Sequence, residues 1–274
     1  GPLAVVIAAN VLNIVLEVWF VYGMHWGIAG SAWGTVVAQW SGALVFAVRL
    51  LRRSGGNVRP DRAELRGLAR VSTTLVVRTG ALFVALTSAS AVAARIDATA
   101  LAAHQVIAQL NLFTALLLDA AAIAAQALIA EASGARDDAR RALVIRRATR
   151  LTAIGSAALC VGLLGGWRAL PAIFSDDRHV VDAVAAVMPI LALMQFPGGA
   201  AYLLDGIVMG QGDFTTAMWS TLAGAVAFAV PAVVVLAHPS YGLRVLWLGL
   251  AAWLVARAIV NATGLRSNRA RLVA

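Results

Sequence analysis

Long apolar runs recur along the whole chain, and they limit its possible folds more than any other feature of the sequence. Each run has about twenty residues with few charges, the length that an α-helix needs to cross a bilayer. A membrane barrel would show short segments of alternating polarity instead. The sequence therefore predicts an all-α integral membrane protein, a polytopic helical bundle with spans at roughly 3–22, 28–48, 71–94, 99–130, 151–170, 180–200, 214–237 and 243–265.

The charged residues are few and unevenly placed. They make up 13% of the 274 residues, whereas about 25% is usual in soluble domains. All 22 basic residues are Arg, and the net charge is +9. The arginines gather in alternate gaps, so we attribute the excess to the positive-inside rule and expect no nucleic-acid binding. The Arg-rich gaps and the C-terminus are then cytoplasmic in a multi-pass protein of a prokaryotic cell membrane, the gaps being 49–70, 136–150 and 266–271.

Signals of soluble enzyme chemistry are missing from the sequence. The four histidines are scattered without metal-ligand spacing, and we find no phosphate-binding loop, dinucleotide fingerprint or pair of carboxylates in an aqueous loop. We therefore expect a protein that is not an enzyme and holds neither a metal nor a cofactor. The single cysteine, Cys160, is predicted to be a small core residue. Four tryptophans near the outer ends of their runs are predicted to be interfacial, namely Trp19, Trp26, Trp167 and Trp247.

A short internal repeat suggests how the spans are grouped. The pattern Trp26-Gly27-Ile28, with Gly34 after it, recurs as Tyr241-Gly242-Leu243, with Gly249 after it, at one offset of 215 residues. The second span then corresponds to the eighth, and the third to eighth spans form one complete six-helix repeat. We predict that 1–50 are the last two helices of an N-terminal bundle, 51–70 a cytoplasmic inter-bundle loop and 71–274 a C-terminal six-helix bundle.

The start of the chain and the predicted inter-bundle loop lead to two further expectations. The chain opens on Gly1-Pro2 without a Met, so we expect it to be a piece of a longer protein. Within the loop, residues 61–70 fit an amphipathic helix on the inner leaflet and fit a plain solvated loop equally well.

The first span contains a polar stripe. Asn10, Asn13 and Glu17 fall within roughly 60° of one another on a helix. An ionisable group inside a spanning helix is costly, about 2.5–3.5 kcal/mol on insertion scales, and it normally faces a polar cavity or a partner. We therefore interpret Glu17 as a functional carboxylate, with Asn13 and Asn10 beside it. The alternative is a structural Glu17 that the two Asn hold or that reaches outward to the interface.

Polar residues also lie inside the third and fourth spans. Arg78 is in the third span, and Gln109, Asp119 and Gln126 are in the fourth. Asp119 and Gln126 are seven residues apart, so they share one helix face. Because sequential spans are antiparallel neighbours, Arg78 and Asp119 can form a buried structural pair. Alternatively, Asp119 is a second titrating carboxylate with Arg78 beside it.

The last three spans add a possible helix break and two more charges. Pro197-Gly198-Gly199 is a sequence that breaks or kinks a helix. Asp205 follows it near the inner end, where a helix-end or loop contact and a transport role fit equally well. Arg257 lies one turn before Asn261 near the cytoplasmic end of the eighth span, and snorkelling to the interface accounts for it.

Several of these stretches together resemble the multidrug and toxic-compound extrusion (MATE) family, most closely its DinF-like branch. The resemblance covers essentially the whole chain. It rests on Asn13-Ile14-Val15-Leu16-Glu17, Phe20-Val21-Tyr22-Gly23, Gly27-Ile28-Ala29-Gly30-Ser31-Ala32, Arg78-Thr79, Ala102-Ala103-His104-Gln105, Leu118-Asp119, Ala124-Ala125-Gln126-Ala127, Leu204-Asp205-Gly206 and Gly210-Gln211-Gly212-Asp213.

The resemblance implies a fold, an activity and a site. The family has twelve helices in two six-helix bundles and exports toxic organic compounds against an inward flow of protons or sodium ions. The first two spans would be the family's fifth and sixth helices. Asn13 and Glu17 match an Asn and an acidic residue of the coupling-ion site, where the family usually has Asp. The other main carboxylate of that site lies on the family's first helix, which this chain does not include.

The resemblance thus implies a secondary active efflux antiporter for small lipophilic, cationic substrates, coupled to H⁺ or Na⁺, and we expect it to work as a monomer in the bilayer. One alternative is a flippase for a lipid-linked precursor, which would need cationic groups around the central cavity; Arg78 is the only deep Arg that the sequence indicates. Others are a lipid enzyme or scaffold, and a fragment that is inactive by itself.

Overall fold

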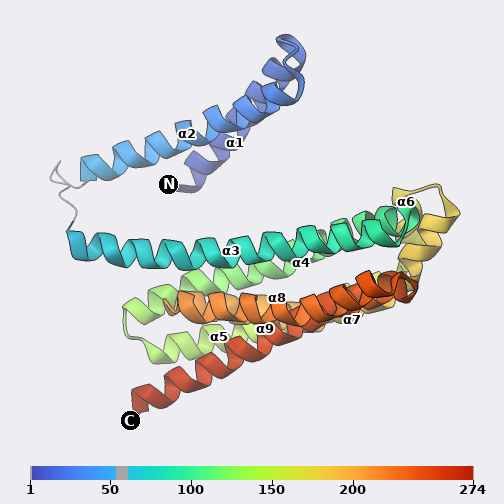
Figure 1. Cartoon of the computed structure of the whole chain (residues 1–274). Helices are drawn as coiled ribbons and strands as arrows, with labels where there is room; N and C mark the ends of the chain where they lie inside the picture. Colours follow the sequence, from blue (N-terminus) through green and yellow to red (C-terminus); the bar gives the residue numbers. More distant parts are fainter. Residues whose placement is uncertain (1, 54–60, 274) are drawn as a thin grey trace. The chain divides into compact units, whose positions relative to one another are not determined.

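The computed structural model describes residues 2–53 and 61–273, and these residues form helices and turns without any strand. Figure 1 shows the helices in chain order. Their bounds are α1 Pro2–Val18, the π-helical η1 Trp19–Gly23, α2 Gly27–Arg53, α3 Arg62–Ile96, α4 Ala98–Gly134, α5 Asp138–Gly165, α6 Ala169–Phe174, α7 Arg178–Gly210, α8 Phe214–Ala237, the 3₁₀-helical η2 Pro239–Tyr241 and α9 Gly242–Val273.

The prediction of a polytopic helical membrane protein is confirmed. In the described part of the chain, eight helical segments are long and apolar enough to cross a bilayer, one for each predicted span. The helices extend into the predicted loop 51–70, because α2 runs to Arg53 and α3 begins at Arg62. Neither alternative for residues 61–70 holds as predicted: from Arg62 on they are helical, but as the first turns of the continuous helix α3 and not as a separate helix on the inner leaflet. The loop residues 54–60, including Gly55-Gly56-Asn57, lie outside the described residues.

The chain divides into an N-terminal unit, Gly1–Arg66, and a C-terminal unit, Gly67–Ala274. The N-terminal unit contains the hairpin of α1 and α2. Small residues of α2 face α1, so the two backbones approach closely, as small residues allow between membrane helices. A Cβ atom on Gly34 would lie 3.2 Å from the backbone nitrogen of Glu17, and one on Gly30 would lie 2.9 Å from the carbonyl carbon of Phe20. That the two units are the end of one bundle and the whole of another stays a prediction.

The structure supports the internal repeat. Gly27 and Gly242 are the first residues of α2 and α9, and both have a left-handed backbone, with φ of +55° and +65°. Only glycine adopts this conformation without strain. The crossings match as well, because Gly34 lies against α1 and Gly249 lies against Pro231 of α8. The hairpins α1–α2 and α8–α9 therefore share a left-handed glycine at the start of the second helix and a close glycine contact seven residues later.

In the C-terminal unit, α7 is the most extensively buried helix, with eighteen buried residues. Its neighbours include α4, α5 and α9. Glycines bring α7 and α4 together: Cβ atoms on Gly206 and Gly210 would lie 2.6 Å and 2.7 Å from the carbonyl oxygens of Ala122 and Gln126. The spacing of four residues puts both glycines on one face of α7. This contact fixes the depth of α7 relative to α4.

The predicted break at Pro197-Gly198-Gly199 is wrong, because α7 continues to Gly210. Membrane helices tolerate proline where neighbouring groups satisfy the freed backbone carbonyl. The glycines serve packing instead. A Cβ atom on Gly199 would lie 2.3 Å from the Ser156 hydroxyl of α5.

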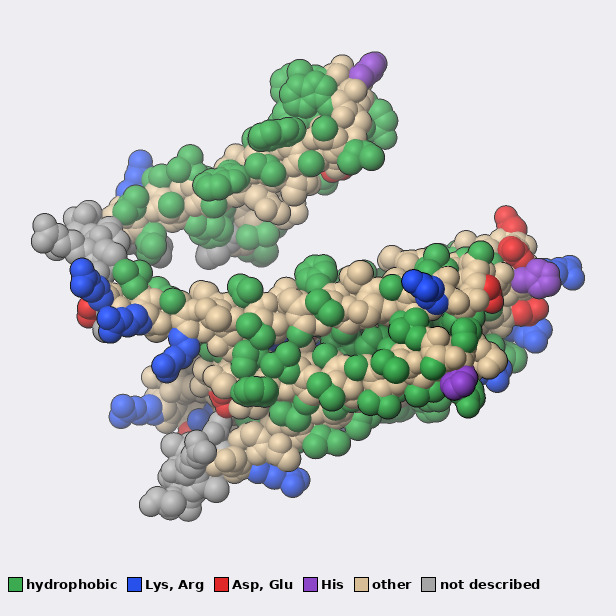
Figure 2. Space-filling view, viewed as in Figure 1, with side chains coloured by type: hydrophobic (Ala, Val, Ile, Leu, Met, Phe, Trp, Pro, Cys, Tyr) green, Lys and Arg blue, Asp and Glu red, His purple; other side chains and the backbone are tan. Residues whose placement is uncertain are grey.

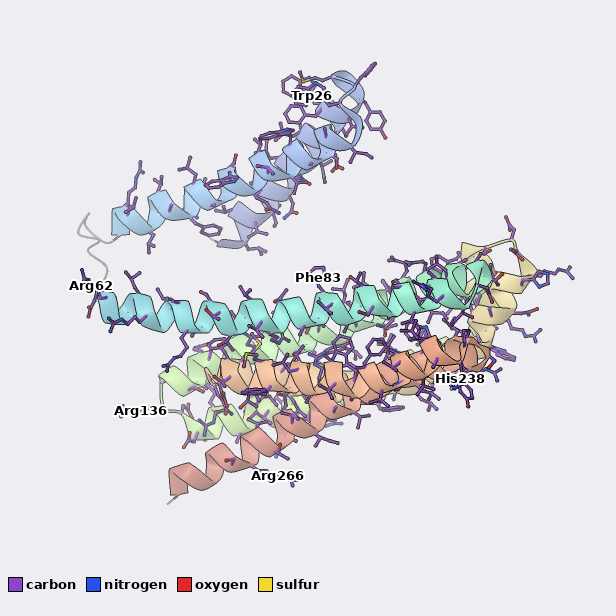
Figure 3. The ribbon with its side chains drawn as sticks, viewed as in Figure 1. Trp26, Arg62, Phe83, Arg136, His238 and Arg266 are labelled. Carbon is purple, nitrogen blue, oxygen red and sulfur yellow. The ribbon has the colours of Figure 1, made fainter. Side chains whose placement is uncertain are left out.

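The surface of the C-terminal unit suits a bilayer. Figure 2 shows hydrophobic side chains along its flank and charged side chains mostly towards the helix ends. Phe83, on α3, is an exposed apolar residue of this flank (Figure 3). Cys160 is buried, which confirms its place in the core. The interfacial prediction for Trp247 is wrong, because its side chain is only 1% exposed and packs in the core.

The α4–α7 contact leads to a stability prediction. Gly206→Ala puts a methyl group against the Ala122 carbonyl oxygen, and overpacking of this kind costs about 1–3 kcal/mol. We expect a lower thermal unfolding midpoint in detergent. The matched control is Gly162→Ala in α5, where a Cβ atom would meet nothing within 4 Å. Equal losses of stability in both variants would contradict this account of the contact.

Candidate functional site

Asp205 of α7 is the centre of a buried polar cluster. Its Oδ2 accepts hydrogen bonds from Nη2 of Arg78 on α3, at 2.6 Å, and from Nη2 of Arg257 on α9. Its Oδ1 accepts from Nδ2 of Asn261 at 2.5 Å and from Oγ of Ser220 on α8 at 3.4 Å. Four helices of the C-terminal unit thus meet at one carboxylate.

The cluster contains one more positive than negative charge. Asp205 and Arg257 are 5% and 4% exposed, and the Arg78 side chain is 22% exposed. The Arg257 guanidinium also lies 5.7 Å from the centre of the Tyr202 ring, in a cation–π contact. Buried ions need this kind of pairing and hydrogen bonding, since their desolvation costs several kcal/mol each. The second Arg leaves a net charge of +1 that Asp205 does not cancel.

Three sequence expectations change here. Arg78 of α3 pairs with Asp205 of α7 and not with Asp119 of α4. Arg257 does not snorkel, since it is buried. Asp205 makes no helix-end or loop contact but joins four helices. One signal could have indicated this cluster: Arg257 and Asn261 are four residues apart, so two donors share one face of an apolar helix.

A cavity of 570 Å³ lies in the C-terminal unit beside this cluster and is open on one side, where Leu116 and Ile123 of its lining are exposed. Side chains of α3, α4, α7 and α9 line it, and they include Asp119, Gln109 and Gln126 of α4 together with Arg78, Asp205 and Arg257. The prediction that Asp119 and Gln126 share a face is therefore confirmed. Asp119 is half-buried and makes no hydrogen bond or ion pair within the described part of the chain.

The N-terminal unit holds a second polar group around Glu17. Ser31 Oγ of α2 donates a hydrogen bond to Glu17 Oε1 at 2.6 Å, and Asn13 Nδ2 donates to Thr35 Oγ1 at 3.3 Å. Asn10 is exposed and bonds the Val6 carbonyl oxygen of its own helix at 2.8 Å. The two Asn therefore do not hold Glu17. The sequence analysis missed Ser31 and Thr35, although their spacing of four residues places both on the face of α2 that carries Gly34.

Local geometry keeps Glu17 against α2. Gly34 allows the backbone of α2 to approach Glu17, and the π-helical turn η1 begins two residues after it. Single π-turns in α-helices often occur at functional sites. The group presents the oxygens of Glu17, Ser31, Asn13 and Thr35, the kind of ligand that hard cations and protons favour. No cluster of three or more His, Cys, Asp or Glu suited to a metal ion is found in residues 2–53 and 61–273.

The Asp205 cluster gives a testable prediction. Asp205→Asn leaves Arg78 and Arg257 without a countercharge, and breaking a buried ion pair costs about 3–5 kcal/mol. We expect a large drop in the unfolding midpoint, measured by thermal unfolding in detergent. Asp182→Asn, at an exposed position of α7, is the control and should change little. Replacing the whole cluster with Arg78→Met, Asp205→Leu and Arg257→Met should recover most of the loss; failure to do so would point to another cause.

Comparisons with known proteins agree with this architecture. The MatE family model matches residues 76–235, more than half of the chain. Protein DETOXIFICATION 43 of Arabidopsis thaliana is 30% identical over 262 residues, which cover 95% of this chain and 49% of that protein. DNA damage-inducible protein F of Escherichia coli K12 is 28% identical over 266 residues, 94% of this chain and 57% of that protein.

A solved structure of the Vibrio cholerae MATE transporter VcmN superposes with a TM-score of 0.81 at 17% identity, over 96% of this chain and 62% of that one. This likeness concerns the fold. The chain spans about half the length of the curated relatives it matches. On the family model and these relatives together, the chain is part of a multi-pass membrane protein that belongs to the MATE family.

Proposed function

We propose that the full-length protein is a secondary active efflux antiporter that exports small lipophilic, cationic compounds and takes up H⁺ or Na⁺ in exchange. Relatives named for multidrug and toxin extrusion support this, among them Multidrug and toxin extrusion protein 1 of Mus musculus, 26% identical over 215 residues. On this proposal the protein works as a monomer, is not an enzyme and needs no cofactor besides its coupling ion.

The observation that carries the coupling proposal is the polar group at Glu17. Glu17 lies in a helix suited to span a membrane, and Ser31 donates to its carboxylate. A bare carboxylate in that setting is unfavourable, so either a proton or a sodium ion would lower its free energy. Asn13 and Thr35 extend the oxygen set beside it.

Coupling would work by changing what Glu17 bonds. Binding of the ion would neutralise the carboxylate and weaken its hydrogen bond with Ser31, since hydrogen bonds to a charged acceptor are the stronger ones. The α1–α2 contact would then favour a different arrangement, and the equilibrium between outward-facing and inward-facing states would shift. A shift of this kind requires that the ion bind the two states with different affinity.

Charge at the helix ends supports an orientation in the cell membrane. Figure 3 shows Arg136 and Arg266 at one end of the C-terminal unit and His238 at the other. Arginines are more numerous at the end that carries Arg136 and Arg266, and under the positive-inside rule that end is cytoplasmic. The C-terminus would accordingly lie in the cytoplasm of a prokaryotic cell.

A lipid-linked precursor flippase is the second candidate, and one specific observation favours it. The cavity of the C-terminal unit is lined by two deep arginines, Arg78 and Arg257, where the sequence indicated one. Asp205 neutralises one of these two charges. The remaining charge of +1 is small for a pyrophosphate, so we rank this function below antiport.

The direct test measures ethidium efflux from proteoliposomes that contain the protein extended to the length of its relatives. We expect efflux under either a proton or a sodium gradient, and Glu17→Gln should abolish the coupling because its side chain cannot ionise. The present chain alone should be silent. Absence of efflux under both gradients would favour the flippase, and gradient-driven efflux by Glu17→Gln would remove Glu17 from the coupling site.

Ser31 offers a finer prediction. Ser31→Ala removes the hydrogen bond to Glu17, which as a bond to a charged group is worth about 1.5–3 kcal/mol. We expect the coupling-ion concentration for half-maximal efflux to change by about tenfold or more. Ser41→Ala, which removes a hydroxyl that bonds only the Val37 carbonyl oxygen of the same helix, is the control. Identical ion dependence in both variants would show that the hydrogen bond from Ser31 to Glu17 does not affect binding of the coupling ion.

A further inference from the structure

Because Arg257 is buried, the cavity in the C-terminal unit has a second positively charged group in its wall. Two guanidinium groups, from α3 and α9, converge on one carboxylate at its wall. Among the described residues that line the cavity, the acidic ones are Asp205 and Asp119. Asp205 is enclosed by its four donors. Asp119 makes no hydrogen bond or ion pair with either Arg, so the excess positive charge of the cluster itself is not neutralised by contact, although the charges of Arg78, Arg257, Asp119 and Asp205 together sum to zero.

The unpartnered polar atoms of the lining are mostly donors. Buried nitrogens without a hydrogen-bond partner in the described part of the chain occur on five lining residues, Arg78 Nε, His104 Nδ1, Trp247 Nε1, Trp253 Nε1 and Arg257 Nε. The Arg and Trp nitrogens can only donate. A buried donor left unsatisfied is costly, so each one favours a ligand or water that supplies an oxygen acceptor.

Most of the remaining lining is apolar, and its other polar side chains are Ser90, Gln109, Asn111 and Gln126. Leucine, alanine and methionine side chains and the rings of Tyr202, Trp247 and Trp253 surround these donors. The volume of 570 Å³ falls in the usual range of small-molecule sites, about 300–1,000 Å³. A ligand that matches this lining has one anionic, oxygen-bearing group on an apolar body.

We propose that the C-terminal unit contains a binding site for a small amphiphilic monoanion, a carboxylate, sulfonate or phosphate monoester, whose charged group is held at Arg78 and Arg257. Asp119 tunes the site, because its negative charge in the same cavity opposes the anion. The site lies wholly in α3, α4, α7 and α9 and does not involve Glu17. It therefore goes beyond the proposed antiport, and binding to it requires no ion gradient.

The test uses the chain in phosphatidylcholine nanodiscs, with 4-(1-pyrenyl)butyrate as the probe. Trp247 and Trp253 line the cavity, so energy transfer from tryptophan to pyrene reports binding, after subtraction of the signal from empty discs. The cationic counterpart, 4-(1-pyrenyl)butyl-trimethylammonium, has the same apolar body. We expect saturable binding of the butyrate and weaker binding of the ammonium compound.

Two variants distinguish an anion-binding site from a cation-binding site. Arg78→Gln should weaken binding of the butyrate about tenfold, the effect of one lost hydrogen bond between charged groups. Asp119→Asn should strengthen it several-fold. Asp119 has no bonded partner whose loss would disturb folding, so the sign of this change decides the result. The controls Arg244→Gln and Asp182→Asn alter charge at exposed positions and should leave affinity unchanged.

Three results would overturn the proposal: weaker butyrate binding in Asp119→Asn, tighter binding of the ammonium probe than of the butyrate, or no effect of Arg78→Gln. Repeating the titration in phosphatidylglycerol discs identifies the source of the natural ligand. Lower probe affinity there, after correction for the weaker partitioning of the butyrate into empty phosphatidylglycerol discs, would assign the site to an anionic lipid headgroup, and unchanged corrected affinity would assign it to a water-soluble organic anion. Loss of ethidium efflux would bear on antiport alone, since neither probe titration depends on a gradient.

Discussion

The arrangement of the C-terminal unit depends on the ion pairs that the Asp205 carboxylate makes with Arg78 and Arg257. The carboxylate neutralises one of two arginines deep in a bundle whose surroundings cannot solvate them. Because Arg78 and Arg257 come from α3 and α9, the bond to each of them fixes the rotation and depth of one helix relative to α7. Apolar membrane helices can slide past one another at little cost, whereas a shared buried ion pair specifies one register.

Both polar clusters lie beside close helix crossings made by glycine. Gly206, next to Asp205, faces the α4 backbone, and Gly34 faces the backbone of Glu17. Side chains as short as Ser31 reach a carboxylate on the neighbouring helix only when the two backbones approach this closely. The glycines that allow close packing therefore also bring the polar side chains of neighbouring helices within bonding distance. In the repeated hairpin α8–α9 the glycine contact is present without a carboxylate beside it, because Ala232 stands at the position that matches Glu17.

The sequence predicted the membrane class, the spans and the shared face of Asp119 and Gln126, because these follow from helix length and helix period. It failed where the outcome depends on which helices become neighbours. Arg78 bonds Asp205, 127 residues away, and no local pattern encodes that partner. The same limit explains Arg257, which resembles a snorkelling residue until α7 is placed against it. The helix break predicted at Pro197 was wrong for a related reason, because tertiary packing stabilises a helix that the local sequence would break.

A double-mutant cycle on Asp205 and Arg257 tests the central claim most directly. Asp205→Leu, Arg257→Met and the double variant would each be unfolded in detergent, and their unfolding free energies compared with that of the original chain. If one compensated cluster joins α7 and α9, the two single losses should exceed the double loss by about 2–3 kcal/mol, the upper range for residues in direct contact. Simple additivity of the two losses would contradict the account.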